Sequence, residues 1–157
     1  MSKQRNEIKE CVRREIELQL DSFLAGFGFI RRKKSMFYGR KLSEYFQRIE
    51  FSIESRPLDN RNAAGVIYPF LEVGVDTVEK QLADMLGDEL SVLIAQPGVT
   101  LRQPIEITSA KAERGRWFLY QPDSVPGAVA QAKKFLTKWT LPFLDEHTCV
   151  ADHLRSL

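Results

Sequence analysis

Residues 45–55 read Tyr-Phe-Gln-Arg-Ile-Glu-Phe-Ser-Ile-Glu-Ser, and they carry the clearest periodicity in the chain. Large apolar side chains stand at Ile49, Phe51 and Ile53, and polar side chains alternate with them. Successive side chains of a β-strand point to opposite faces of the sheet, so this pattern predicts a strand with one buried and one solvated face. The buried face needs a covering layer, and the flanking sequence supplies the candidates for it.

Further strands are expected on both sides of this segment. Residues 36–42 precede it closely enough to form an antiparallel hairpin, and residues 66–75 show the same alternation and predict a third strand. Pro69 has no N–H to donate to a ladder, so it should lie at an edge or at a bulge. Two later stretches rich in β-branched and aromatic residues are also predicted to be strands: 105–109 and 116–121.

Helical periodicity predicts the elements that cover the sheet. One apolar stripe runs along residues 6–25 and consists of Ile8, Val12, Ile16, Leu20, Phe23 and Leu24. A second long helix begins near Ser124, whose hydroxyl can cap it, and Pro142 should kink or end it. The apolar face of this helix is predicted to be Val129, Ala132, Leu136, Trp139 and Phe143. Shorter helical segments are expected over 77–86 and 150–157.

The order of these elements is helix, three strands, short helix, two strands and long helix. Hairpin-linked strands with long helices towards the two ends of the chain favour an α+β fold. We therefore expect an antiparallel sheet of about four to five strands, with the N-terminal and C-terminal helices packed on one face. The length of 157 residues fits a single domain over 1–157, and no repeat or linker divides it.

Composition sets the broad class of protein. Hydrophobic residues make up 43% and charged residues 28% of the chain, which is typical of a folded globular protein and not of a disordered one. No apolar run approaches the roughly 20 residues that cross a bilayer, and no apolar signal core follows the polar start. These observations predict a cytoplasmic protein without a membrane partner.

The residue types that often carry chemistry show no catalytic or metal-binding spacing. Cys11 and Cys149 stand far apart in the sequence without a Cys-x-x-Cys motif, and both are expected to be reduced. His147 and His153, with Cys149 and Asp152 between them, match neither a zinc knuckle nor a helical histidine pair. Phosphate-binding glycine loops and nucleophile elbows are absent from the sequence as well. The prediction is a protein without catalytic residues, bound metal or cofactor.

The strongest local feature is a basic-aromatic segment, residues 31–41, with six Lys or Arg residues and two aromatic ones. It belongs to the more basic part of the chain, because residues 1–62 carry a net charge of +5 and residues 63–157 carry −3. Clustered cations beside aromatics hold phosphates and stack bases, and they also complement acidic protein surfaces. The alternative is that Phe37 faces the core and the cations are merely solvated at the start of a strand.

Six residues are predicted to contact a partner: Arg32, Lys34, Tyr38, Arg40, Arg56 and Arg61. Charge reversal at Arg32, Lys34 and Arg40 is expected to slow association with an acidic protein. Stability should change little, because exposed charges rarely contribute more than about 1 kcal/mol each. If the partner is a nucleic acid, the same reversal should abolish a steeply salt-dependent retention.

Several short patterns in the first half of the chain match one bacterial family. The matching residues are Gly28 and Phe29, the basic stretch 31–34, Phe37, Tyr38 and Arg40, Ile49 and Phe51, and Ser55 and Arg56. With the strand around Glu72, these patterns resemble the domain-of-unknown-function 4304 family, whose usual Asn and Gln stand here as Glu72 and Ser52. The resemblance implies an α+β fold, and it brings no established activity, cofactor or catalytic residue. Small orphan domains of this kind often look like components of bacterial conflict systems.

Together these observations favour a non-enzymatic protein-binding module in the cytoplasm, specifically an immunity-type protein that binds and neutralises a bacterial toxin domain. The rival hypothesis is a nucleic-acid-binding accessory protein that uses residues 31–41. A hydrolase or transferase with an unrecognised site is a distant third. A gene position directly after a large secreted toxin gene would favour the first hypothesis over the second.

Overall fold

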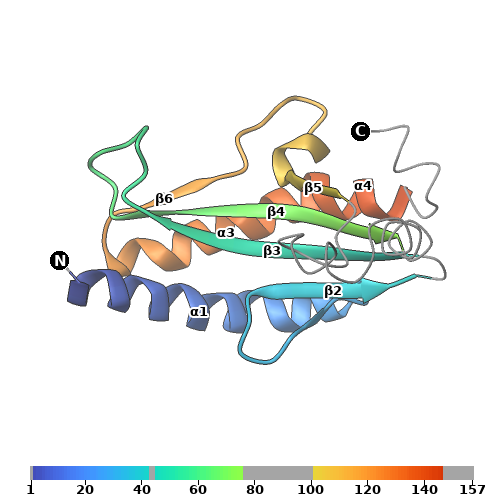
Figure 1. The fold of residues 1–157 in the computed structure, drawn as a ribbon, viewed down its shortest axis with the longest axis horizontal. Coiled ribbons are helices and arrows are strands. Elements are labelled where there is room, and N and C mark those ends of the chain that lie inside the picture. Colours follow the sequence, from blue (N-terminus) through green and yellow to red (C-terminus); the bar gives the residue numbers. More distant parts are fainter. Residues whose placement is uncertain (1, 43–44, 76–100, 147–157) are drawn as a thin grey trace, which may run out of the picture.

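The computed structural model describes residues 2–42, 45–75 and 101–146 (Figure 1). A long helix, α1 (Ser2–Ala25), precedes all the strands. The strands are β1 (Ile30–Arg31), β2 (Phe37–Lys41), β3 (Tyr45–Ser55), β4 (Gly65–Val75), β5 (Leu101–Pro104) and β6 (Trp117–Leu119). The last helical region consists of α3 (Val125–Phe135), a π-helical turn (Leu136–Thr140) and α4 (Leu141–Glu146).

The strands form an antiparallel sheet in the order β1-β2-β3-β4-β5, and β6 pairs with β4 beyond the end of β5. β3 and β4 pair over their whole length, from Tyr45 opposite Val75 to Ser55 opposite Gly65. The predicted α+β fold with an antiparallel sheet is confirmed. The sheet has six strands instead of four to five, because β1 is only two residues long and carries too little periodicity to be predicted.

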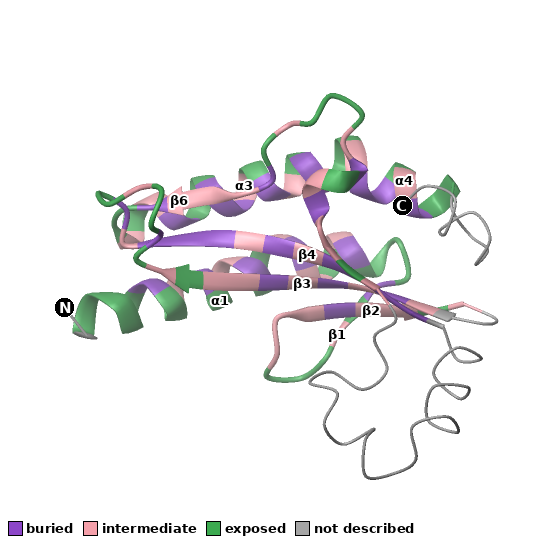
Figure 2. Ribbon diagram, turned by 45° about the horizontal axis from the view of Figure 1, so that its top comes forward, coloured by how far each residue is buried: buried purple, intermediate pink, exposed green. Residues whose placement is uncertain are grey.

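The helices cover one face of the sheet (Figures 1 and 2). Ile49 and Phe51 of β3 are buried beneath them, and Ile53 is half-buried at the margin of the same core. Five residues of the predicted stripe of α1 are buried: Ile8, Val12, Ile16, Leu20 and Leu24. Their four-residue spacing keeps one side of the helix against the sheet, and burial of each such side chain contributes about 1.5–3 kcal/mol.

Gly28 reverses the chain between α1 and β1. Its φ is +86°, a conformation that glycine adopts at little cost. The N–H of Phe29 then donates to the carbonyl of Leu24 at 3.0 Å, which closes the C-terminal end of α1. As a result Phe29 enters the core instead of continuing along the helix surface.

Pro69 lies within β4, which has neighbours on both sides, yet it interrupts no ladder. Its Cα partner is Phe51, whose own N–H donates to Met36 on the side of β2. The N–H and carbonyl of a residue in an antiparallel strand point to the same side, so Phe51 and Pro69 form a non-hydrogen-bonded pair. The nitrogen of Pro69 therefore points away from β3. On that side of β4, β5 pairs with residues 70–73 and β6 pairs with residues 65–67, so Pro69 lies between the two pairings. At Pro69, β4 therefore behaves as an edge strand on that side, which agrees with the predicted edge position.

The strand predicted at 105–109 is wrong. The strand lies four residues earlier, as β5, and Ile105–Thr108 forms a turn of 3₁₀-helix instead. The hydroxyl of Thr108 donates to the carbonyl of Ile105 at 2.7 Å. This local bond stabilises the turn against the β propensity of its Ile and Thr residues. The strand predicted at 116–121 is confirmed in its central residues as β6.

The π-helical turn changes which side of the last helical region is buried. The N–H of Leu141 donates to the carbonyl of Leu136, five residues earlier, so this turn contains one residue more than an α-helical turn. The buried face therefore moves by one position. Thr140, the last residue of the turn, is buried, as are Leu141 and Leu144 after it, whereas the predicted Trp139 and Phe143 are half-buried.

Helix α4 continues through Pro142, so this proline does not end the last helical region. In a regular α-helix the proline ring would clash with the carbonyl four residues earlier. The wider π-helical turn lies directly before Pro142 and is a common site of such an adjustment. Ser124 also differs from its predicted role, because its hydroxyl donates to the carbonyl of Gln121 at 2.6 Å and makes no cap bond to α3.

Several sequence predictions lie outside the described residues. These are the helix at 77–86, the helical turn at 150–157, and His147, Cys149, Asp152 and His153.

Candidate functional site

The basic-aromatic segment does not form one surface, because β2 alternates its side chains between the two faces of the sheet. Tyr38 lies opposite the core residue Ile49, so Tyr38 and Arg40 point toward the helices. Phe37 and Lys41 point to the other face, which we call the second face of the sheet. The described helices α1, α3 and α4 leave the second face uncovered.

Tyr38 is a core residue. It is fully buried, and its ring meets that of Phe51 edge-on with the centroids 5.9 Å apart. Its hydroxyl forms a short hydrogen bond to a carboxylate oxygen of Asp21. Burial raises the pKa of Tyr38, and the hydrogen bond to Asp21 raises that pKa further, so the phenol stays protonated. Tyr38 presents no surface to a partner, which corrects its assignment as a contact residue.

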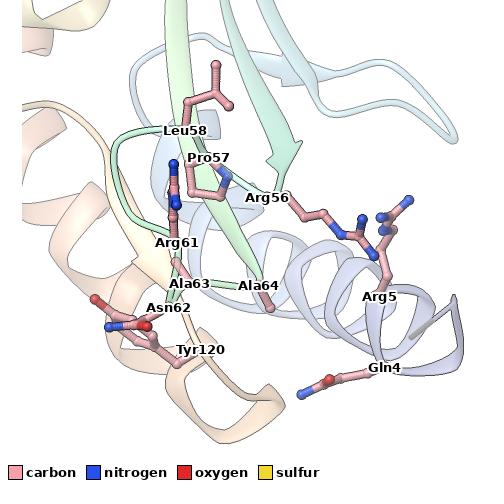
Figure 3. A pocket seen from close by; sticks show the side chains of 10 residues that line it. All are labelled: Gln4, Arg5, Arg56, Pro57, Leu58, Arg61, Asn62, Ala63, Ala64 and Tyr120. Atoms are coloured by element: carbon pink, nitrogen blue, oxygen red, sulfur yellow. The ribbon is translucent and has the colours of Figure 1, made fainter.

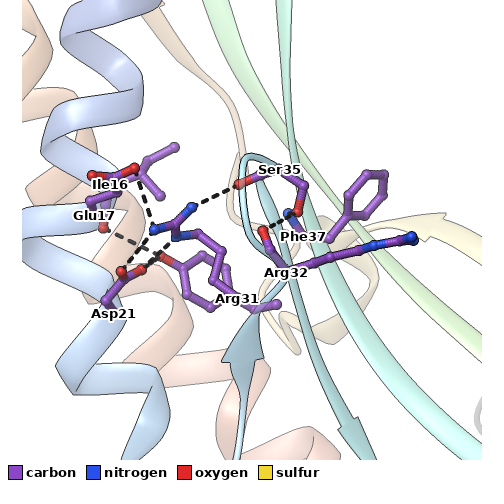
Figure 4. A network of polar contacts seen from close by, with 8 residues as sticks. Ile16, Glu17, Asp21, Arg31, Arg32, Ser35 and Phe37 are labelled. Carbon is purple, nitrogen blue, oxygen red and sulfur yellow. Dashed lines mark hydrogen bonds and ion pairs between the residues drawn. The ribbon is translucent and has the colours of Figure 1, made fainter.

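The same carboxylate of Asp21 is held by Arg31 (Figure 4). Arg31 donates to the two oxygens of Asp21 at 2.9 and 3.1 Å and to the carbonyl of Ser35 at 3.3 Å, and Glu17 lies 3.3 Å away. Burial raises the pKa of Asp21, but the hydrogen bonds from Arg31 and Tyr38 outweigh it and lower the pKa below its ordinary value. This network ties α1 to β1 and β2.

Arg40 is also a structural residue, with only 12% of its side chain exposed. Its guanidinium lies 4.5 Å from the ring centre of Phe29. It donates three hydrogen bonds, to Gln47 Oε1 at 2.7 Å, the Phe27 carbonyl at 2.9 Å and Asp145 Oδ1 at 3.1 Å. These bonds join β2 to the loop after α1 and to α4, so Arg40 is not available to a partner in the way the sequence suggested.

Charge reversal at Arg40 should therefore destabilise the protein, contrary to the expectation from sequence. Arg40→Glu removes the three hydrogen bonds and places a carboxylate beside Asp145, so the free energy of unfolding should fall by about 2–3 kcal/mol. Lys41→Glu is the control, because Lys41 is exposed and should change stability by less than about 0.5 kcal/mol. Urea denaturation followed by circular dichroism measures both. Two equally small losses would mean that Arg40 behaves as a surface charge.

Three exposed cations of the segment, Arg32, Lys33 and Lys34, lie in the turn between β1 and β2. The N–H and hydroxyl of Ser35 both donate to the carbonyl of Arg32, at 3.0 and 2.7 Å, and Lys34 adopts φ +61°. These local bonds fix the turn while the side chains of Arg32 and Lys34 stay exposed. Neither of these two has an ion-pair partner in the described part of the chain. Their charges are available to a partner.

A hollow of about 420 Å³ lies on the second face beside this turn. Its apolar side chains come from three strands, and one of them, Ile30, is 75% exposed. Five cationic residues line the hollow; the side chains of Arg31 and Arg40 point to the helix-covered face, which leaves Arg32, Lys41 and Arg48 on this face. We call this site the basic-aromatic hollow and define it by Ile30, Arg32, Phe37, Lys41, Phe46 and Arg48. Sequence reasoning missed Ile30, Phe46 and Arg48, because only the pairing of β1, β2 and β3 brings them next to Phe37.

Arg48 links the hollow to a buried ion pair. Its guanidinium lies 4.9 Å from the ring centre of Phe37 and 5.4 Å from that of Phe46, and it donates to Glu72 at 2.6 Å. Arg102 donates to the other oxygen of Glu72 at 3.3 Å. Burial and the neighbouring Glu50 raise the pKa of Glu72, which is 1% exposed, and Arg48 offsets this rise only in part. Arg48 is therefore held in place as part of the wall of the hollow.

Arg56 and Arg61 lie at the opposite end of β3, in the loop between β3 and β4 (Figure 3). They line a surface pocket of about 470 Å³ together with the start of α1 and Tyr120. We call this second site the arginine pocket and define it by Gln4, Arg5, Arg56, Arg61, Asn62 and Tyr120. The predicted contact residues thus separate into three groups: Arg32 and Lys34 beside the hollow, Arg56 and Arg61 in the arginine pocket, and Tyr38 and Arg40 in structural positions.

Metal-binding side chains do not gather in the described ranges, where no group of three or more His, Cys, Asp or Glu residues could hold an ion. Cys11 is a free, half-buried cysteine on α1. Among residues 2–42, 45–75 and 101–146, no helix combines the length and the apolar character that a membrane span requires.

Comparison of the chain with protein-family models, with curated proteins and with solved structures found no match in any of the three. The resemblance to the domain-of-unknown-function 4304 family therefore stays a prediction.

Proposed function

We propose that this protein is a non-enzymatic, cytoplasmic protein-binding module of the immunity type, which binds and neutralises a bacterial toxin domain through the basic-aromatic hollow. One observation carries the proposal: three apolar side chains and three cations from β1, β2, β3 and the adjoining turn meet on the second face of the sheet. An apolar centre with a charged rim is the usual anatomy of a protein interface.

The chemistry of the hollow suggests what the partner presents. Ile30, Phe37 and Phe46 offer apolar surface for one large aliphatic or aromatic anchor, and such anchors contribute most of the energy at interfaces. Arg32 and Lys41 lie at the rim, where they would attract Asp or Glu residues beside that anchor. The favoured partner surface is therefore an apolar side chain flanked by carboxylates.

The side chains that line the hollow support binding over catalysis. The described residues that line it are apolar residues, a glycine, arginines and a lysine, and no histidine, cysteine, serine or carboxylate is among these described residues. General acid–base or nucleophilic chemistry needs such groups within reach of the substrate. Arg48 is already bonded to Glu72 and so shapes the site more than it reacts.

Site-specific photo-crosslinking in the native cell tests the proposal. A photoreactive residue at Lys41 should capture a protein with a toxin domain, whereas the same residue at Leu18, which is exposed on α1, should not. The captured toxin domain is then purified, and its activity is measured with and without this protein. Inhibition at a one-to-one ratio is the expected result.

Association kinetics with the captured domain test the role of the rim charges. Arg32→Glu with Lys41→Glu should slow association about 10-fold to 100-fold at low salt, and the effect should shrink at high salt. Arg14→Glu with Lys134→Glu is the matched control, because both residues are exposed on the helices and the charge change is the same. Equal effects of the two pairs, or a captured protein that is not inhibited, would contradict the proposal. A steep salt-dependent gel shift of DNA or RNA, abolished by the first pair, would instead favour the nucleic-acid hypothesis.

A further inference from the structure

The outer side of β6 is a free edge of the sheet. β6 pairs with β4 on one side, and among the described strands none pairs with it on the other. The backbone groups of Ile67, like those of Pro69 two residues later, point away from β3, because this direction alternates along a strand. Ile67 lies opposite Trp117, so these two form a hydrogen-bonded pair. The N–H and carbonyl of the next residue, Phe118, therefore point outward from the sheet.

Helix α3 turns this edge into a groove. It lies beside β6, and the rings of Trp117 and Phe135 pack edge-on with their centroids 5.8 Å apart (Figure 2). A hollow of about 410 Å³ lies between the two elements. At one end the hydroxyl of Ser124 accepts the N–H of Tyr120 at 3.2 Å, so the free backbone groups lie on the side of Phe118. We call this site the edge groove and define it by Arg114, Arg116, Phe118, Tyr120, Gly127 and Gln131.

Gly127 leaves room in the wall that α3 contributes. The side of the helix that lines the groove consists of residues 124, 127, 128 and 131, whose spacing keeps them on one side. Gly127 is exposed, and a Cβ at this position would meet no atom within 4 Å. Its φ is not positive, and glycine is less favourable than alanine inside a helix. The helix therefore does not require this glycine, whereas a side chain that enters the groove gains space from it.

The groove also carries positive charge that no acid neutralises. None of the described residues that line it is Asp or Glu. Arg116 is balanced by Asp59 at 2.7 Å, and Glu113 in the preceding loop is bound to Lys138 at 2.7 Å. Arg114 is exposed and, within the ranges that the structure describes, takes part in no ion pair. The charge of Arg114 favours a partner that carries a carboxylate.

We propose that the edge groove binds an extended peptide segment of a partner protein, which adds to the sheet as a strand beside β6 and carries an Asp or Glu residue next to Arg114. The backbone of the segment bonds to the N–H and carbonyl of Phe118. Alternate side chains of the segment point toward α3, where Gly127 leaves space. Strand addition of this kind gains affinity from main-chain bonds and specificity from the side-chain contacts.

This proposal does not depend on the function assigned to the basic-aromatic hollow. β6 pairs with the start of β4, which lies opposite the end of β3, whereas Phe46 of the hollow lies near the start of β3. The two surfaces therefore belong to different ends of the sheet, and a partner at one leaves the other accessible.

Selection of random peptides, displayed on phage, against the full chain tests the proposal. The enriched peptides should carry Asp or Glu at a fixed position, and synthetic copies should bind saturably in calorimetric titration. Methylation of the peptide amides, one at a time, should weaken binding at every second residue, because only alternate N–H groups of an added strand face β6.

Amide hydrogen exchange locates the added strand on the protein. A bound peptide should slow exchange of the Phe118 N–H about tenfold or more, because this group gains a hydrogen bond. The N–H of Trp117 is already bonded within the sheet and should change less.

Matched variants then test the two walls. Gly127→Gln fills the groove and should weaken peptide binding about tenfold or more, whereas Gly127→Ala should bind normally. Arg114→Glu should also weaken binding about tenfold, and Arg14→Glu, an exposed arginine on α1 outside the groove, is its control. Thermal unfolding should show both Gly127 variants folded, since alanine and glutamine are better helix formers than glycine.

Four results would overturn the proposal: no enriched peptide, equal binding by the two Gly127 variants, equal binding by Arg114→Glu and Arg14→Glu, or unchanged exchange at Phe118. Sedimentation of the chain alone tests a different occupant. A dimer that Gly127→Gln dissociates would assign the edge groove to a second copy of this chain and would likewise overturn the proposal.

Discussion

Replacement of Phe51 by alanine is expected to lower the free energy of unfolding by about 3–5 kcal/mol. Phe51 lies in the middle of β3, buried beneath the helices, and its ring contacts Tyr38 edge-on. Truncation removes the burial energy of the ring and leaves a cavity that the paired strands β2 and β4 are too constrained to close. Urea denaturation at an unchanged m-value measures the loss.

The neighbouring Ser52→Ala variant provides the control for Phe51→Ala. Ser52 points to the second face and is half-buried, so its replacement should change stability by less than about 0.5 kcal/mol. The contrast between adjacent residues tests the alternation of β3 directly. Similar losses in the two variants would show that Phe51 does not face the helices.

Replacement of Asp21 by alanine is expected to cost about 3 kcal/mol, the second largest effect. The change leaves the buried hydroxyl of Tyr38 and the guanidinium of Arg31 without their shared carboxylate. Loss of one partner from a buried ion pair costs about 3–5 kcal/mol, and we expect the lower end because the side chain of Asp21 is 37% exposed. Glu10→Ala is the control, since Glu10 pairs with Arg13 on the exposed side of α1 and should cost little.

The contribution of Asp21 should also depend on pH. Its pKa is lowered in the folded protein, from an ordinary value of 3.8, because the bonds from Arg31 and Tyr38 outweigh its burial. The stabilisation is therefore complete above that ordinary value and is lost as the pH falls through the lower folded pKa. Asp21→Asn has no carboxylate to titrate. The difference in the free energy of unfolding between this variant and the natural protein should therefore become smaller below pH 3.8. A difference in the free energy of unfolding that stays constant until acid unfolds the protein would refute this role of Asp21.

The two candidate sites lie far enough apart to be occupied at the same time. Phe46 belongs to the basic-aromatic hollow near the start of β3, and Arg56 belongs to the arginine pocket just after its end. A strand advances about 3.3 Å per residue, so ten residues separate the two by roughly 33 Å. A variant in one site should therefore leave the other site unchanged.

Local periodicity was sufficient to predict α1 and β3. The stripe from Ile8 to Leu24 and the alternation through Ile49 and Phe51 each face one covering layer, so the sequence period matches the geometry of the element. Prediction failed where a local interaction altered the chain. The Thr108 hydroxyl turns a β-prone stretch into a 3₁₀ turn, and the π-helical turn shifts the buried face to Leu144.

The candidate sites were only partly predictable, because residues distant in sequence form them. Arg32, Arg56 and Arg61 were chosen from sequence and lie at one site or the other. Ile30 and Phe46 carried no signal of their own, since each is a single apolar residue until strand pairing places it beside Phe37. Arg5 belongs to the arginine pocket only because α1 runs beside the loop after β3.

From the order of its residues alone, this chain specifies an antiparallel sheet with helices on one face and a basic segment beside its first long strand. The sequence does not specify which cations in that segment are free. Arg32 and Arg40 are chemically identical, but Arg32 lies in a solvated turn and Arg40 is bound to Gln47 and Asp145. The partners of Arg40 come from β3 and α4, so the difference between a binding residue and a structural one arises only when these elements pack together.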